Sequence, residues 1–102
     1  MRIGLGTIAK LRLNFTAEGK EIGADKIADF TAQFFVSPSR KLVINKSEMI
    51  AEDGGYIVFV DTAEIGIGKL QYNMVLEVLD PQYPEAYRKE VTTYSTDIEI
   101  YK

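Results

Sequence analysis

Hydrophobic and polar positions alternate along most of the chain, and the clearest pattern lies between Tyr56 and Asp80. Residues 56–60 form an unbroken run of β-branched and aromatic side chains, and residues 69–79 alternate, with Leu70, Tyr72, Met74, Leu76 and Val78 on one face. A two-residue period is typical of a strand. The pattern therefore predicts two strands joined by a glycine-marked turn at residues 61–68. We expect the other strands to pack against this pair.

Shorter segments of the same kind predict strands at residues 8–15, 29–36, 41–46, 88–95 and 97–101, with a weak strand at 47–51. Residues 16–21 read as a polar turn with Gly19 at positive φ, and Asp53-Gly54-Gly55 suits a tight hairpin. Residues 22–28 fit either a short strand or a loop. Prolines at 81 and 84 predict an ordered loop over residues 80–87, with one helical turn at most and its two tyrosines held against the sandwich edge.

About seven to eight short strands with intervening turn signals, and no segment with helical period, predict an all-β domain. We expect one domain over residues 1–102, an antiparallel, immunoglobulin-like β-sandwich, with a closed barrel as the second choice.

The composition removes several classes of chemistry. There is no cysteine or histidine, so the commonest metal ligands and general base are missing. A net charge of −3 argues against a sequence-independent nucleic-acid binder. No segment approaches the ~20 apolar residues of a membrane span, and Lys10 and Arg12 cut short the apolar start, which argues against a signal peptide. We expect a soluble, non-enzymatic protein without cofactors.

Three candidate sites are weak on chemical grounds. Gly66-Ile67-Gly68-Lys69 leads into a strand, whereas a phosphate loop must open a helix, so we expect a turn or bulge. Asp61, Thr62 and Glu64 supply too few oxygens for calcium, and we expect Asp61 to cap the turn. No pair of carboxylates is marked out for glycoside hydrolysis.

The aromatic side chains leave one further class open. Tyr83, Tyr87, Tyr94 and Tyr101 are the rings that we expect to be exposed, and exposed rings can form a sugar-binding platform. Edge and core packing is the competing interpretation. A carbohydrate-binding module is therefore the alternative function, with a glycan as its partner.

The order of turn motifs in the carboxy-terminal half is more specific. A strand ends in Asp61-Thr62, Ile65-Gly66-Ile67-Gly68-Lys69-Leu70 follows, and a long strand leads to the proline-containing loop at residues 80–91. Over residues 56–101, and more loosely 29–37, the chain resembles small β-sandwich domains of phages and prophages of Bacteroides-type bacteria. Those domains in turn resemble the amino-terminal domain of siphophage upper baseplate proteins.

This resemblance implies a structural role in a phage tail or baseplate. The domain would be a virion component assembled in the bacterial cytoplasm, and its partners would be copies of itself or other phage structural proteins. Exposed strand edges and an aromatic loop are suitable for such contacts. We expect the contact surface at Phe35, Ile67, Tyr83 and Tyr87.

Overall fold

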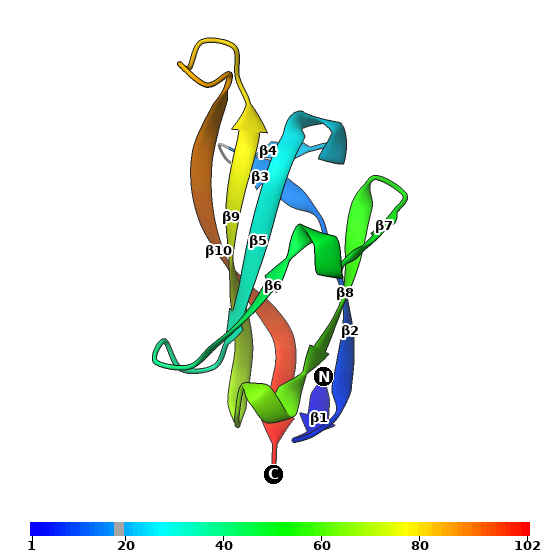
Figure 1. The fold of residues 1–102 in the computed structure, drawn as a ribbon. Helices are drawn as coiled ribbons and strands as arrows, with labels where there is room; N and C mark the ends of the chain where they lie inside the picture. Colours follow the sequence, from blue (N-terminus) through cyan, green and yellow to red (C-terminus); the bar gives the residue numbers. More distant parts are fainter. Residues whose placement is uncertain (18–19) are drawn as a thin grey trace.

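The computed structural model describes residues 1–17 and 20–102, which build two facing β-sheets (Figure 1). One sheet has five strands in the order β1-β10-β9-β5-β6, and the other has three in the order β2-β8-β7. A β3–β4 hairpin is added to them. The strands are β1 (Arg2–Gly4), β2 (Ile8–Leu13), β3 (Phe15–Ala17), β4 (Lys20–Ile22), β5 (Ile27–Phe35), β6 (Lys41–Asn45), β7 (Ile50–Glu52), β8 (Gly55–Asp61), β9 (Gly68–Leu79) and β10 (Tyr87–Tyr101).

The all-β sandwich expected from the sequence is confirmed. The described helical segments are single 3₁₀ turns, η1 (Ala24–Lys26), η2 (Lys46–Glu48) and η3 (Thr62–Glu64). No helix within the described part of the chain has the length and apolar character that crossing a membrane requires. Pairing is antiparallel except between β1 and β10, which run parallel. The described strands number ten because short three-residue strands add to those that alternation reveals.

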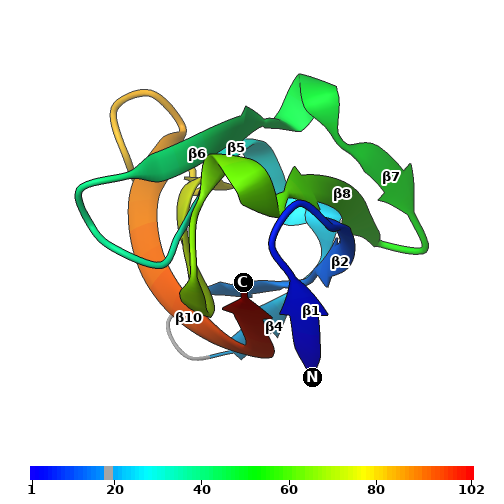
Figure 2. The same ribbon diagram turned by 90° about the horizontal axis from the view of Figure 1, so that it is seen from below.

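The two strands at the centre of the sequence pattern do not pair, which corrects one expectation. β8 pairs with β2 and β7, whereas β9 pairs with β10 and β5. The chain passes from one sheet to the other through η3, so the apolar faces of β8 and β9 meet across the core instead of side by side. Seen from below, the two sheets curve around this common centre (Figure 2).

The core is formed by the inward faces of both sheets. The predicted apolar face of β9 is buried at Leu70, Met74, Leu76 and Val78, and Tyr72 is partly buried beside it. Val58 and Val60 of β8 and Leu13 of β2 close the core from the other side. The burial of alternate residues is what a strand with one covered face produces.

Residues 88–101, predicted as two strands, belong to one long strand. The register of β10 against β9 shifts between Ser95 and Glu99. At this irregularity the Thr96 hydroxyl donates to the Leu70 carbonyl (2.7 Å) and accepts from the Ile98 amide (3.1 Å). The bulge bends β10, so that its end buries Ile98 and reaches β1.

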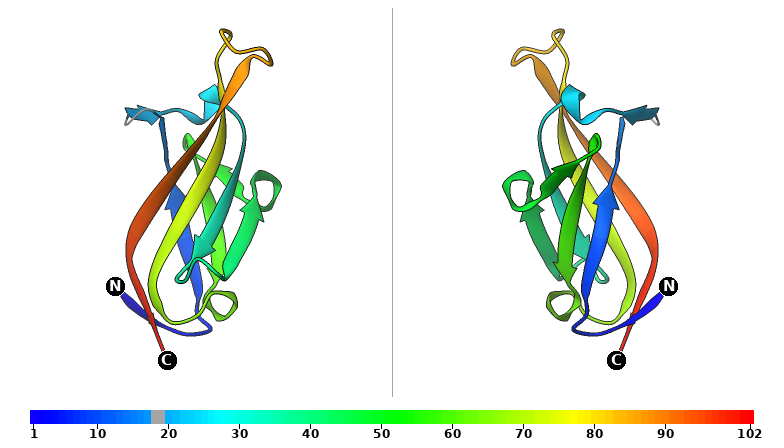
Figure 3. Two further views of the ribbon diagram at one scale, coloured as in Figure 1. Left: turned by 90° about the vertical axis from the view of Figure 1, so that its left-hand side faces the viewer. Right: turned by 90° about the vertical axis from the view of Figure 1, so that its right-hand side faces the viewer.

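The proline-containing loop extends β9 and β10 beyond the sandwich, at the end opposite both termini (Figure 3). The Asp80 amide donates to the Ala86 carbonyl (2.9 Å), and β10 begins at Tyr87 without a helical turn. Tyr83 is 48% exposed, so it is not held against the sandwich edge as expected. The loop projects because it joins β9 and β10 as a hairpin beyond Val78, the last residue of β9 that pairs with β5.

Two other turns agree with their sequence signals. The β7–β8 hairpin turns at Asp53 and Gly54, both with positive φ. The ambiguous residues 22–28 divide between the end of β4, η1 and the start of β5. Gly19 lies outside the described residues.

Candidate interaction surface

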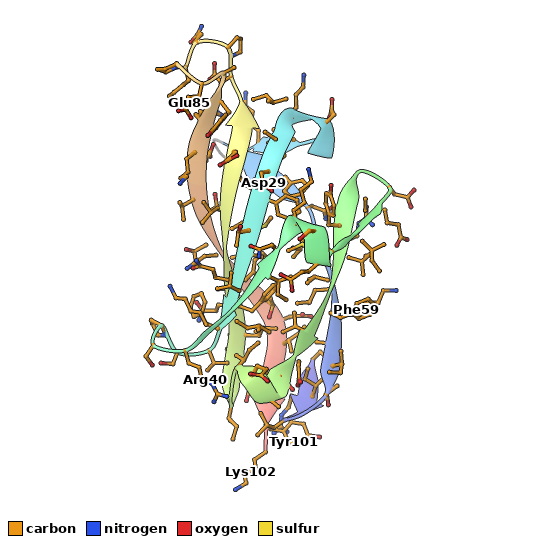
Figure 4. All side chains as sticks on the ribbon, in the orientation of Figure 1. Asp29, Arg40, Phe59, Glu85, Tyr101 and Lys102 are labelled. Carbon is orange, nitrogen blue, oxygen red and sulfur yellow. The ribbon has the colours of Figure 1, made fainter. Side chains whose placement is uncertain are left out.

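Four apolar side chains form a diagonal stripe on the outer face of the three-stranded sheet. In the strand register, Lys10 lies opposite Phe59, and Ile57 lies opposite Ile50. Ile8, the first residue of β2, lies two residues before Lys10 and is therefore on the same face. The stripe consists of Ile8, Phe59, Ile57 and Ile50. Ile8 is 56% exposed, Ile50 55% and Phe59 52%, and Phe59 lies on the side of β8 away from the five-stranded sheet (Figure 4).

The stripe exists because β8 is apolar on both faces. Val58 and Val60 point into the core, so Ile57 and Phe59 must point outward. In a two-layer domain only one face of each sheet is covered by the other sheet. The unbroken apolar run at residues 56–60 therefore indicated a strand with one uncovered apolar face. No contact surface was predicted there from the sequence.

Two cations border the stripe along β2. The Arg12 guanidinium donates to the carbonyls of Glu52 (3.0 Å) and Asp53 (2.9 Å), so its side chain crosses β8. Ile57, which lies between Arg12 and Ile50 in the register, is only 7% exposed. Arg12 thus holds the β7–β8 turn and lies across Ile57, which is typical of a long basic side chain on an apolar surface. Lys10 leaves a second positive charge beside Phe59.

The four residues expected to make contacts lie at two ends of a molecule 48 Å long. Phe35 is buried at the end of β5, with the Lys41 ammonium 5.6 Å from its ring centroid, so it offers little surface. Ile67 is 52% exposed in the turn before β9. Tyr83 and Tyr87 lie at the far end, around the β9–β10 turn. A hydrogen bond to Glu85, followed by the charge of Glu77, raises the pKa of the Tyr87 phenol.

The tyrosines considered for sugar binding do not share a face. Tyr94 is partly buried and stacks on Tyr72, with ring centroids 4.9 Å apart. Tyr101 lies at the end with the chain termini, where the Arg2 guanidinium is 4.8 Å from its ring centroid. Tyr83 belongs to the loop between β9 and β10, which lies at the opposite end of the molecule (Figure 1). The exposed rings are therefore too scattered to form one platform.

Tyr72 belongs to a row of rings that crosses the inner face of the five-stranded sheet. Its ring centroid is 5.3 Å from that of Phe34. Burial, and secondarily the neighbouring Tyr94, raises the pKa of the Tyr72 phenol to about 12. This row is part of the hydrophobic packing, and its phenol stays neutral well above physiological pH.

The weaker candidate sites take the structural roles expected of them. Asp61 accepts a hydrogen bond from the Ala63 amide (3.0 Å) and so caps η3. Gly66 and Gly68 have positive φ in the turn before β9, and β9 begins at Gly68 where a phosphate loop would begin a helix. Within residues 1–17 and 20–102, no three acidic side chains are grouped closely enough to hold a metal ion.

Comparisons with protein-family models, with curated proteins and with solved structures each found no match.

Proposed function

We propose that this chain is a non-enzymatic assembly module that makes protein–protein contacts through the stripe of Ile8, Phe59, Ile57 and Ile50. The observation that carries the proposal is that three large apolar side chains on the same face of the three-stranded sheet, Ile8, Phe59 and Ile50, are each more than half exposed. Single exposed apolar residues are common on protein surfaces, whereas a contiguous apolar patch is typical of an interaction site.

The size of the stripe favours an assembly of several weak contacts. Covering the exposed halves of three such side chains contributes about 1 kcal/mol each. Association costs at least ~4 kcal/mol in lost translational and rotational freedom. The stripe alone therefore supports weak pairing, and repeated contacts within a symmetric assembly would make the attachment strong.

The biological setting in this proposal comes from the sequence. The order of turn motifs from Asp61-Thr62 to the loop at residues 80–91 resembles phage and prophage β-sandwich domains. We accordingly place the module in a phage tail or baseplate, assembled in the bacterial cytoplasm. Its partners would be further copies or neighbouring virion proteins.

Light scattering over a concentration series tests self-association through the stripe. We expect the average mass of the wild type to rise with concentration and that of Phe59→Ser to stay at the monomer value. Val91→Ser is the matched control, because Val91 is 62% exposed on the other sheet. A wild type that stays monomeric at millimolar concentration would exclude self-association and leave a different virion protein as the partner.

Carbohydrate binding is the second candidate function. It has less support than assembly, because the exposed tyrosines are scattered whereas the apolar residues of the stripe share one face. A glycan array separates the two. Saturable binding that Tyr83→Ala or Tyr101→Ala abolishes would favour the carbohydrate module, while an array without binding would favour assembly.

A further inference from the structure

A groove of about 600 Å³ opens on the side of the sandwich where β6 leaves the five-stranded sheet. Its apolar lining comes from Phe30, Tyr56, Met49 and Ala51, and its polar lining includes Asp29 and Lys46. The Phe30 and Tyr56 rings pack edge to face, with centroids 4.8 Å apart. The groove therefore combines an apolar interior with a charged rim, and it lies outside the stripe on the outer face of the three-stranded sheet.

One wall of the groove is an edge at the start of β5 that η2 borders but that no strand of the described sheet pairs with. β6 pairs with β5 only from Thr31 to Phe35, because the chain turns into η2 after Asn45. The first part of β5, residues 27–30, pairs with β9 on one side, and the described sheet has no strand on its other side. Unpaired backbone groups on such an edge can receive an additional strand.

Two of these backbone groups already form hydrogen bonds with side chains. The Phe30 amide donates to Asp29 Oδ1 at 2.9 Å, and Lys46 Nζ donates to the Ala28 carbonyl at 3.5 Å. The two groups are two residues apart, and the register of β5 against β9 shifts between Ile27 and Asp29, so this edge carries a bulge at Ala28. Asp29 and Lys46 can both form hydrogen bonds with water instead, so their displacement by a peptide backbone costs little net free energy.

We propose that this groove binds an extended peptide segment of a partner protein, which adds as a strand beside residues 27–30 and continues the line of β6. This inference rests on the proposed assembly function and specifies the kind of partner. Main-chain hydrogen bonds to Ala28 and Phe30 replace those made by Lys46 and Asp29. Affinity comes from the backbone, and specificity comes from alternate side chains.

The surroundings of the edge define the peptide. Side chains on its inward face meet the apolar lining formed by Tyr56, Met49 and Ala51. Side chains on its outward face lie in the row of Asp29 and Glu77, whose two carboxylates are matched by Lys89 in the same row and by Lys46 in the groove lining. The preferred segment therefore alternates apolar residues with polar ones.

A sugar fits these observations less well. Sugars bind to the open faces of aromatic rings, but Phe30 is only 2% exposed and its ring packs against both Phe15 and Tyr56. What the groove offers is a backbone edge and a lining that is part apolar and part polar.

The test is a titration of the isotope-labelled protein followed by backbone-amide NMR. The probe is a pool of eight-residue synthetic peptides with Val, Ile, Leu or Phe at alternate positions and Thr or Lys between them. We expect saturable shifts at the Ala28, Asp29 and Phe30 amides and slower hydrogen exchange at Phe30. The absence of saturable shifts at these amides would overturn the proposal.

Backbone methylation separates strand addition from simple occupation of the groove. Two versions of the pool are N-methylated at odd or at even positions, so that each lacks the N–H groups of one edge. Strand addition requires one version to bind and the other to fail, because a paired strand uses one edge. Equal binding by both versions would overturn strand addition.

Two variants locate the site and separate this proposal from the assembly function. Ala51 is exposed on β7 and lines the groove, so Ala51→Trp fills the groove without disturbing the core, and we expect about ten-fold weaker peptide binding. Unchanged affinity in that variant would contradict the site. Phe59→Ser should bind the peptides normally while losing self-association, so each proposal can fail without the other.

Discussion

The Thr62 hydroxyl donates a hydrogen bond to the Thr7 carbonyl at 2.8 Å and accepts one from the Gly6 amide at 2.9 Å. The Thr62 amide also donates to the Thr7 carbonyl (3.2 Å), and the side chain is fully buried. Residues 5–7 lead from β1 into β2, and η3 leads from β8 into β9. This contact therefore joins two of the connections through which the chain passes between the five-stranded and the three-stranded sheet.

Thr62→Val should destabilise the fold by about 1–3 kcal/mol, because the new methyl group replaces the hydroxyl that is hydrogen-bonded to both the part-buried Gly6 amide and the Thr7 carbonyl. The measurement is urea unfolding at neutral pH. Thr93→Val is the matched control, since Thr93 is exposed and its bond to Asn73 (2.8 Å) is easily replaced by water. We expect the control to change the free energy of unfolding by less than about 0.5 kcal/mol. Equal losses in both variants would refute the special role of Thr62.

Gly68→Ala should cost more than Gly6→Ala, although both glycines have positive φ. A Cβ at Gly6 has no neighbour within 4 Å, whereas a Cβ at Gly68 would collide with Val36 Cγ1. We expect backbone strain of about 1–3 kcal/mol in each variant, and about 1–3 kcal/mol more at Gly68 from overpacking. A double-mutant cycle with Val36→Ala measures this second contribution. Additive effects of the two substitutions would exclude the collision as its cause.

The stability of the fold should fall as the pH rises from about 10 to about 12. Burial raises the pKa of Tyr72 from 10.0 to about 12, so the unfolded chain loses this proton first. The contribution of the neutral Tyr72 phenol to stability is complete below its pKa in the unfolded chain. It is lost as the pH rises through its pKa in the folded protein. Urea unfolding at roughly pH 9 and pH 11 measures the decline. Tyr72→Phe should make the decline shallower, and an unchanged slope would show that another group causes it.

Phe59→Ser should leave the fold nearly as stable as the wild type, within about 1 kcal/mol, because half of this side chain is already in water. Phe34→Ala, at a fully buried position, should cost about 3–5 kcal/mol. Thermal unfolding of the two variants checks the difference. A large loss in Phe59→Ser would mean that the stripe stabilises the monomer and would weaken its assignment as an interaction surface.

The sequence by itself determined the local features of this protein. Alternation placed β5, β6, β8 and β9, and Asp53-Gly54 marked the β7–β8 turn. These features depend on neighbouring residues alone, since a strand shows its faces through a period of two and a tight turn requires particular backbone angles.

Only the tertiary structure decided how the strands combine. The pattern around residues 56–80 gave no sign that η3 would send β8 and β9 into different sheets, because pairing depends on residues far apart in the chain. β8 is apolar on both faces, so its own residues could not show that Val58 is covered and Phe59 is not. The open edge of β5 likewise depends on where β6 turns away, because strand pairing is set by partners distant in sequence.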